Sequence, residues 1–264
     1  MKRKHVLHTI AALALLLGFG APARADVYDD LMAAKKIRIA TDLALPPAGM
    51  MDAQMHPIGA DVEVAEKLAK DWGVQLEFVQ TTGATRIPNV QTGKADVIIS
   101  TLSVTPERAK VIDFSKAYAV LQSVVGALKG LDLKRYEDLK GRTVAVTRGT
   151  TQDTTLTPLA SQYGFRMQRY EDDATLVTAA VTGQADIVAT SASQVGAMRE
   201  KNPARGFEPK FVITNFDLAM GVRKGEPKLL EKLNAWISEN LKNGSLNAIF
   251  KKYYGTDLPE AMRS

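Results

Sequence analysis

The sequence predicts an α/β protein built from two related lobes, and three observations support this prediction. Strand-like segments alternate along the chain with segments whose apolar residues recur at helical spacing. Two stretches nearly repeat each other, TGKADVIISTLS at residues 92–103 and TGQADIVATSAS at residues 182–193. Each copy stands at the same place in its own series of strands and helices, as expected for two similar domains.

The first half of the chain contains five expected elements. Apolar residues at helical spacing run up to Gly73, which suits the end of a helix. Val74, Leu76 and Phe78 then alternate as they would in a strand. In chain order, we expect a strand at 36–41, a helix at 61–72, a strand at 74–78, a short helix at 87–92 and a strand at 96–99.

The pattern restarts after Gly141 and ends in a helical region. The expected elements are a strand at 143–147, a helix that ends at Gly164, a strand at 166–170, a helix at 173–181, strands at 186–189 and 218–223, and helices after 226. Asp96 and Asp186 stand at the heads of the two repeated strands. We interpret them as turn or cap residues rather than a catalytic pair, because they would lie far from the hydroxyls and from each other.

Two extended segments, at 118–125 and 215–221, flank the second half of the chain. We interpret them as two crossings between domains, so that the second lobe is inserted into the first. The expected division is a leader at 1–25, a first lobe formed by 26–120 with 218–264, and a second lobe formed by 121–217.

The N-terminus has the pattern of a cleavable signal peptide. Three basic residues lie near the start, an apolar run covers 10–20, and Ala23-Arg24-Ala25 precedes Asp26. The alternative, a membrane anchor, would need an apolar run of about 18 residues or more. We expect a free protein of a bacterial periplasm, since the chain has no cysteine to carry a lipid.

Composition excludes several classes of site. Without the leader, which holds four basic residues and no acid, the formal net charge falls from +5 to +1. The charge therefore does not indicate a nucleic-acid partner. The chain has no cysteine, and His56 is its only histidine beyond the leader. A histidine–cysteine metal site is not available, and we expect neither a metal nor a cofactor.

Both repeats end in hydroxyl-bearing residues, and in open α/β sheets ligands bind at the carboxyl ends of strands. Thr105 suits an N-cap and Pro106 the first helical position, which leaves free N–H groups beside these hydroxyls. Arg108 can add a planar fork of donors, and together these groups would receive a carboxylate. The alternative is a capped helix with a surface arginine. The sequence GTTQ at 149–152 is a similar device, and Asp42 could receive a cation or cap a turn.

Several motifs, in combination and in order, resemble the periplasmic solute-binding proteins of polar amino-acid ABC importers (solute-binding protein family 3). The resemblance covers residues 36–255. The motifs are Ala40-Thr41-Asp42 with Pro46-Pro47, Gly59-Ala60-Asp61-Val62-Glu63, Gly93-Lys94-Ala95-Asp96, Ser103-Val104-Thr105-Pro106-Glu107-Arg108, Phe114-Ser115 with Tyr118, Gly149-Thr150-Thr151-Gln152, Gly183-Gln184-Ala185-Asp186 and Met220-Gly221-Val222-Arg223-Lys224.

This resemblance implies a type II periplasmic-binding-protein fold, in which two α/β lobes joined by two hinge strands close on one small ligand. Arg108 would hold the ligand's α-carboxylate, and residues 150–152 would contact it from the second lobe. An ABC permease in the inner membrane would be the partner, and a monomer is the expected state. The expected ligand-binding residues are Asp42, Leu45, Ser100, Thr101, Leu102, Ser103, Arg108, Thr147, Thr150, Thr151, Gln152 and Ser191.

The sequence departs from the family pattern in two places. The first ligand loop, at 43–48, has no aromatic residue to stack on a ligand. The position five residues after Asp186, where many members have an aspartate for the α-amine, is Ser191. A buried ammonium group without a counter-charge is costly. We therefore expect a small carboxylate-bearing ligand, with an amino acid favoured, and either Asp42 or another acid as the counter-charge.

Two rival functions share this fold. Periplasmic prephenate or arogenate (cyclohexadienyl) dehydratases need a carboxylic acid poised over the substrate, and the hydroxyls around Ser191 offer none. We therefore expect a binding protein rather than an enzyme. A soluble sensor module that presents its ligand to a kinase or chemoreceptor would have the same sequence features.

Overall fold

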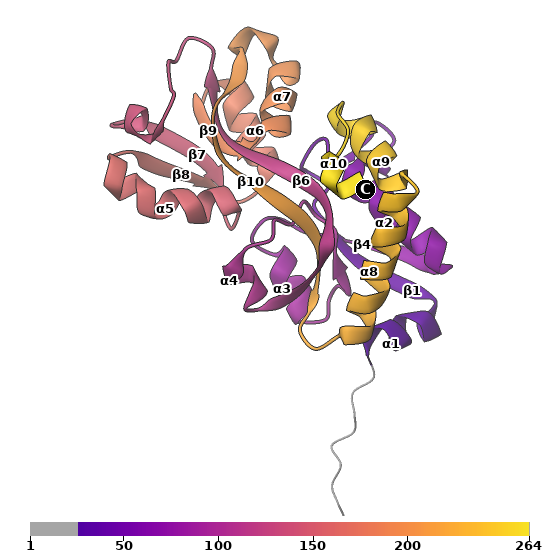
Figure 1. Cartoon of the computed structure of the whole chain (residues 1–264). Coiled ribbons are helices and arrows are strands. Elements are labelled where there is room, and N and C mark those ends of the chain that lie inside the picture. The colour runs from indigo at the N-terminus through magenta and orange to yellow at the C-terminus, as the bar shows by residue number, and fades with distance from the viewer. Residues whose placement is uncertain (1–25, 264) are drawn as a thin grey trace, which may run out of the picture.

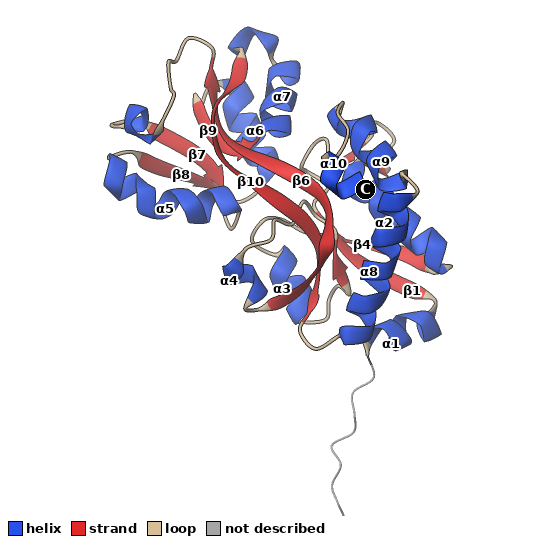
Figure 2. Ribbon diagram, in the orientation of Figure 1, coloured by secondary structure: helices blue, strands red, loops and turns tan. Residues whose placement is uncertain are grey.

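The computed structural model describes residues 26–263, which form two α/β lobes joined by two long strands (Figures 1 and 2). The two-lobed α/β fold expected from the sequence is confirmed. The expected signal peptide at 1–25 lies outside the described residues. Within 26–263, none of the helices combines the length and the apolar character that crossing a bilayer requires.

One sheet of eight strands runs through both lobes. Its members are β1 (Lys36–Thr41), β4 (Gln75–Gln80), β5 (Val97–Ile98), β6 (Ile112–Leu128), β7 (Thr143–Thr147), β8 (Arg166–Tyr170), β9 (Ile187–Ser191) and β10 (Phe207–Arg223). The order is β4-β1-β5-β10-β6-β9-β7-β8. A separate small hairpin consists of β2 (Met50–Met51) and β3 (Pro57–Ile58).

The two lobes repeat one arrangement of strands. In the first lobe β1 pairs in parallel with β4 and β5, and in the second β7 pairs in parallel with β8 and β9. The strands β5 and β9 each lie antiparallel to one long strand, β10 and β6 respectively. The near-repeat in the sequence thus leads into β5 and β9, and the hydroxyl-rich ends of both strands lie beside the crossing strands.

Helices cover the sheet in both lobes (Figure 2). In the first lobe they are α1 (Val27–Ala34), α2 (Ala60–Trp72), α3 (Arg86–Gln91), α4 (Pro106–Ala109), α8 (Pro227–Lys242), α9 (Ser245–Tyr254) and α10 (Glu260–Arg263). In the second lobe they are α5 (Thr151–Tyr163), α6 (Asp173–Thr182) and α7 (Ala192–Lys201), with short 3-10 turns at Tyr136–Leu139 and Pro203–Arg205.

Local sequence signals explain most helix ends. Gly73 and Gly164 end α2 and α5 in the left-handed conformation, which glycine adopts without steric cost. The Asp172 side chain caps α6 by accepting from the backbone N–H of Thr175. The helix α7 was not expected, because its N-cap, Ser191, and the residues after it read as a hydroxyl-rich loop.

The crossings between the lobes are longer than the sequence indicated. Both β6 and β10 have 17 residues, and they pair antiparallel along most of their length. The ladder is interrupted by register shifts, for example between Val212 and Thr214 and between Leu218 and Ala219. Because these strands belong to both lobes, the division at 120/121 and 217/218 stays a prediction.

Each lobe has its own hydrophobic core. The cluster under β1 includes the buried side chains of Ile37, Leu68 and Trp236, and a second cluster between β5 and α3 also belongs to the first lobe. Two clusters pack on the two faces of the second lobe's sheet, around Leu176 and Leu156. Independent cores allow the lobes to move as units about the crossing strands.

Gly221 in β10 lies where the crossing strand packs closely against the first lobe. A Cβ atom there would lie 2.6 Å from Leu102 Cδ2 and 3.0 Å from Ile98 Cδ1. We expect Gly221→Ala to lower the free energy of unfolding by about 1–3 kcal/mol through overpacking, measured by urea denaturation. Gly196→Ala is the control, because it adds a methyl group to α7 in open space. Equal stabilities of the two variants would contradict the expectation.

Candidate functional site

A small cavity lies between the two lobes. It leaves about 40 Å³ open to the centre of a water-sized sphere. The first lobe and the crossing strand β6 contribute Leu45, Pro46, Pro47, Ala48, Arg86, Thr101, Ser103, Leu121 and Tyr254. The second lobe contributes Thr150, Thr151, Gln152, Asp173, Thr190, Ser191 and Ser193. The wall is therefore polar on both sides, and both hydroxyl-rich strand ends contribute to it.

Some residues of the hydroxyl-rich end of β5 line the cavity, and others are buried in the first lobe. Thr101 and Ser103 line the cavity. Thr101 has a left-handed backbone (φ 46°), and its hydroxyl donates to buried Asp61 at 2.7 Å. The Ser100 hydroxyl instead accepts from the backbone N–H of Asp42 at 3.1 Å.

Leu102 was expected at the site, and its ligand contact stays a prediction. Its side chain is fully buried in the core of the first lobe, close to Gly221. The left-handed backbone of Thr101 breaks the extended chain after β5, so Leu102 does not follow strand alternation. Leu102 therefore supports the loop but does not line the cavity.

Arg108 lies between the lobes but is not part of the cavity wall. Thr105 caps the short helix α4, with Pro106 in its first turn, as expected. The guanidinium donates from Nη1 to the carbonyl of Ser103 at 3.0 Å and from Nη2 to the carbonyl of Gly149, in the second lobe, at 3.3 Å. Burial, together with the like charge of Arg86, lowers the pKa of Arg108 to about 9. Its role as a carboxylate receptor stays a prediction.

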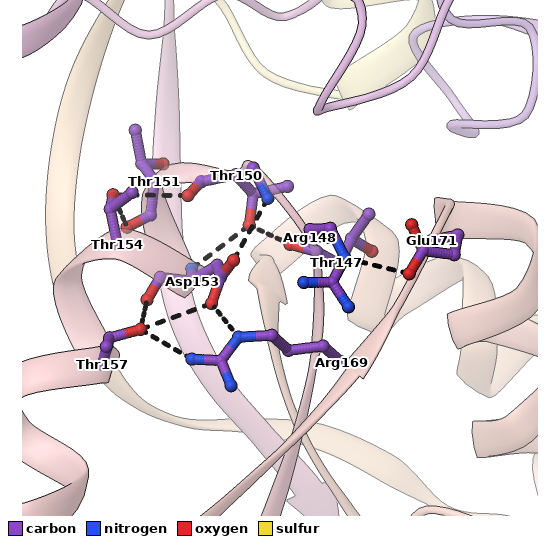
Figure 3. A network of polar contacts seen from close by, with 10 residues as sticks. Thr147, Arg148, Thr150, Thr151, Asp153, Thr154, Thr157, Arg169 and Glu171 are labelled. Carbon is purple, nitrogen blue, oxygen red and sulfur yellow. Dashed lines mark hydrogen bonds and ion pairs between the residues drawn. The ribbon is translucent and has the colours of Figure 1, made fainter.

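Thr150 and the first residues of α5 form part of the facing wall. Figure 3 shows the polar contacts around them. Thr150 is the N-cap of α5, and its hydroxyl also donates to the carbonyl of Thr147 at 2.7 Å. Gly149 has φ 74°, and a Cβ atom there would lie 2.8 Å from Ala84 Cα of the first lobe. Figure 3 shows Arg148 turned towards Glu171, at 2.9 Å. The two lobes thus meet backbone to backbone beside the cavity.

Four expected residues reach the cavity from this lobe, and one does not. Thr150, Thr151 and Gln152 line it, together with Ser191. The hydroxyl of Ser191 accepts from the backbone N–H of Gln194 at 3.1 Å, as an N-cap. Thr147 is not among the residues that line the cavity. Its hydroxyl donates to the carboxylate of Asp173, which does line the cavity.

The aspartates at the strand heads have structural roles. Asp96 forms an ion pair with Arg38, and Asp186 forms one with Arg205. Neither lines the interlobe cavity. Both carboxylates are therefore held by arginines away from the interlobe cavity.

Asp42 caps a turn. One carboxylate oxygen accepts from the backbone N–H of Ala44 at 2.9 Å, and the residue is 4% exposed. It is not among the residues that line the cavity. Burial, reinforced by the negative charge of Asp173, raises the pKa of Asp42 to about 7. Of the two roles expected for it, the turn cap is the one seen.

The cavity residues missing from the expected ligand-binding set include the ionisable side chains of Arg86, Asp173 and Tyr254. Arg86 begins α3 and donates to the carbonyl of Ser100 at 2.6 Å. Asp173 is the first residue of α6, where an acidic side chain is ordinary. Tyr254 is the last residue of α9 and follows the two lysines of that helix's last turn. No local pattern marks these three, because only the packing of the two lobes brings them together.

Comparison with known proteins identifies the family. The family model for bacterial extracellular solute-binding proteins, family 3, matches residues 37–256. The chain belongs to this family. It is therefore a solute-binding protein, and the expectation that it is not an enzyme is confirmed, because its relatives are named as binding proteins.

Relatives and solved structures cover nearly the whole chain. The histidine-binding periplasmic protein of Escherichia coli K12 is 29% identical over 261 residues, covering 94% of this chain and 97% of the relative. The L-arginine-binding protein of Pseudomonas aeruginosa is 27% identical, covering 85% and 90%. ArgBP from T. maritima, as a crystallised mutant, is 30% identical with a TM-score of 0.79, covering 86% and 99%.

One solved structure bears on the dehydratase alternative. The ancestral amino acid-binding protein AncCDT-1, a precursor of cyclohexadienyl dehydratase, is 30% identical with a TM-score of 0.77, covering 87% of this chain and all of that one. This ancestor is itself described as a binding protein, so the likeness does not favour a dehydratase.

The carboxyl group of Asp42 should make stability depend on pH. The folded chain holds this proton up to about pH 7, whereas an unfolded aspartate ionises near pH 4. The free energy of unfolding should therefore fall as pH rises from about 4 to 7. We expect Asp42→Asn to be more stable than the natural chain by about 1–4 kcal/mol at pH 8, and equally stable at pH 4.

The measurement is chemical denaturation at both pH values. Asp132→Asn, which removes an exposed carboxylate, is the matched control and should leave the difference between the two pH values unchanged. Parallel pH profiles for the natural chain and Asp42→Asn would show that the buried carboxyl group has no such effect.

Proposed function

We propose that this chain is the periplasmic receptor of an ABC importer and that it binds an amino acid, or a related small carboxylate, in the interlobe cavity. A signal peptide at residues 1–25 directs export and is removed before Asp26, and the protein acts as a monomer that docks on an inner-membrane permease. The relatives support an amino acid as the ligand, since they include proteins named as histidine-, glutamine- and arginine-binding.

The observation that carries the proposal is that both lobes line one small polar cavity. Residues 150–152 face Thr101 and Ser103 across it, and each side offers hydroxyl or amide groups. A solute that bonds to both walls stabilises the closed arrangement relative to the open one. The register shifts in the paired crossing strands lie between the lobes and suit the hinge of this motion.

Arg108 is the proposed receptor for the carboxylate. Its Nη1 bonds to the carbonyl of Ser103, whose residue lines the cavity, so a small rotation of the side chain would bring the guanidinium to the wall. Within residues 26–263 it forms no ion pair, which leaves its charge available. An anionic group gains a charge-assisted hydrogen bond from such a donor.

Calorimetry with the twenty common amino acids tests the function. We expect at least one to bind, and we expect Arg108→Met to weaken its binding by about 10- to 100-fold, since a hydrogen bond to a charged group is worth about 1.5–3 kcal/mol. Arg148→Met is the matched control, because that side chain pairs with Glu171, and it should change the affinity less than about threefold. Equal losses in both variants would contradict the role of Arg108.

Uptake distinguishes transport from sensing. A strain without this chain should lose import of the radiolabelled amino acid that binds most tightly, and expression of the natural chain should restore it. Unchanged import, with a lost behavioural or transcriptional response to the same amino acid, would instead indicate a sensor.

A further inference from the structure

The interlobe cavity contains a buried charge of each sign, and among the described residues neither charge is held in a salt bridge. Arg86, from the first lobe, is 6% exposed, and Asp173, from the second, is 4% exposed. Both line the cavity, yet among the described residues neither forms an ion pair within 4 Å. Isolated buried charges are costly, so a bound group of opposite sign would stabilise each of them.

The carboxylate of Asp173 has one direct hydrogen bond among the described residues. One carboxylate oxygen accepts from the hydroxyl of Thr147 at 2.8 Å. Burial raises the pKa of Asp173, although Thr147, the charge of Arg86 and the nearby amide of Gln194 act in the opposite direction. The cavity side of this carboxylate is therefore a place where a cationic group would be favoured.

The other candidates for binding an ammonium group are already engaged. The hydroxyl of Ser191 accepts from a backbone N–H and lies 3.0 Å from the hydroxyl of Ser193. The two oxygens of Asp61 accept from Thr101 and Tyr118, at 2.7 and 3.0 Å. Asp42 caps its turn, and neither Asp42 nor Asp61 lines the cavity.

We propose that Asp173 binds the ammonium group of the ligand and thereby supplies the counter-charge that Ser191 cannot. This inference rests on the proposed function and makes it narrower: the ligand is an amino acid, not merely a carboxylate. Its carboxylate faces Arg86 and Arg108 in the first lobe, and its ammonium group faces the second. Because the two buried charges come from opposite lobes, a zwitterion pairs both only when the lobes are closed.

Calorimetry with matched ligands tests the inference. The pairs are L-histidine with 3-(imidazol-4-yl)propionate, L-glutamine with glutaramate, and L-arginine with 5-guanidinopentanoate, which differ only by the α-amino group. On the natural chain we expect the desamino compound to bind at least about 30-fold more weakly than its amino acid. Asp173→Asn should weaken the binding of the amino acid by a similar factor, and it should change the affinity for the desamino compound by less than about threefold.

Asp172→Asn is the matched control. Residue 172 is the neighbouring aspartate, it caps α6, and asparagine caps a helix equally well. It should change the binding of either compound less than about threefold.

Two results would overturn the inference and leave the proposed function standing: a desamino compound that binds the natural chain as tightly as its amino acid, or an Asp173→Asn variant with undiminished affinity. The first comparison needs no variant, so it decides even where Asp173→Asn does not fold. If none of the six compounds binds the natural chain, the inference also fails, whereas the proposed function fails only if the wider amino-acid panel fails as well.

Discussion

The pairing of β6 with β10 is the constraint on which the rest of the structure depends. These two strands are the shared middle of the eight-stranded sheet, and each borders the repeated strand of one lobe. The hydroxyl-rich ends of β5 and β9 therefore meet at the same junction. The pair fixes where the lobes face one another, while its register shifts leave it able to bend.

The charged side chains at this junction are buried, but they form no salt bridges among the described residues. Asp42, Asp61 and Asp173 surround Arg86, and burial is the main reason that the pKa of each aspartate is raised. Asp61 is satisfied by two hydroxyls, so it helps to hold the wall in place. Asp61 therefore stabilises the protein around the cavity, whereas Arg86 and Asp173 line the cavity and can contact a solute.

The sequence predicted most of the fold because the signals for it are local. The strands at 36–41, 143–147 and 166–170 match β1, β7 and β8 residue for residue, and glycines marked the ends of α2 and α5. The unexpected α7 begins with a serine cap that resembles a binding loop, since a hydroxyl serves both purposes.

The site was predicted only in part, since a cavity between lobes depends on contacts distant in sequence. The hydroxyls of Thr101 and Ser103 and the second-lobe loop were found because they follow strands. Leu102 stays a prediction, and its side chain packs in the core of the first lobe. Arg86 and Asp173 were missed because each looks ordinary at a helix start.

The contact between bare backbones beside the cavity has one more consequence. Gly83 and Gly149 lie on opposite lobes and approach each other closely. A Cβ atom on Gly83 would lie 2.9 Å from the carbonyl oxygen of Arg148, and one on Gly149 would lie 2.8 Å from Ala84 Cα. Affinity can therefore be adjusted remotely: one added carbon at this rim would hold the lobes apart and reduce the population of the closed state. Solute selectivity would remain, because none of the groups that recognise the solute would change.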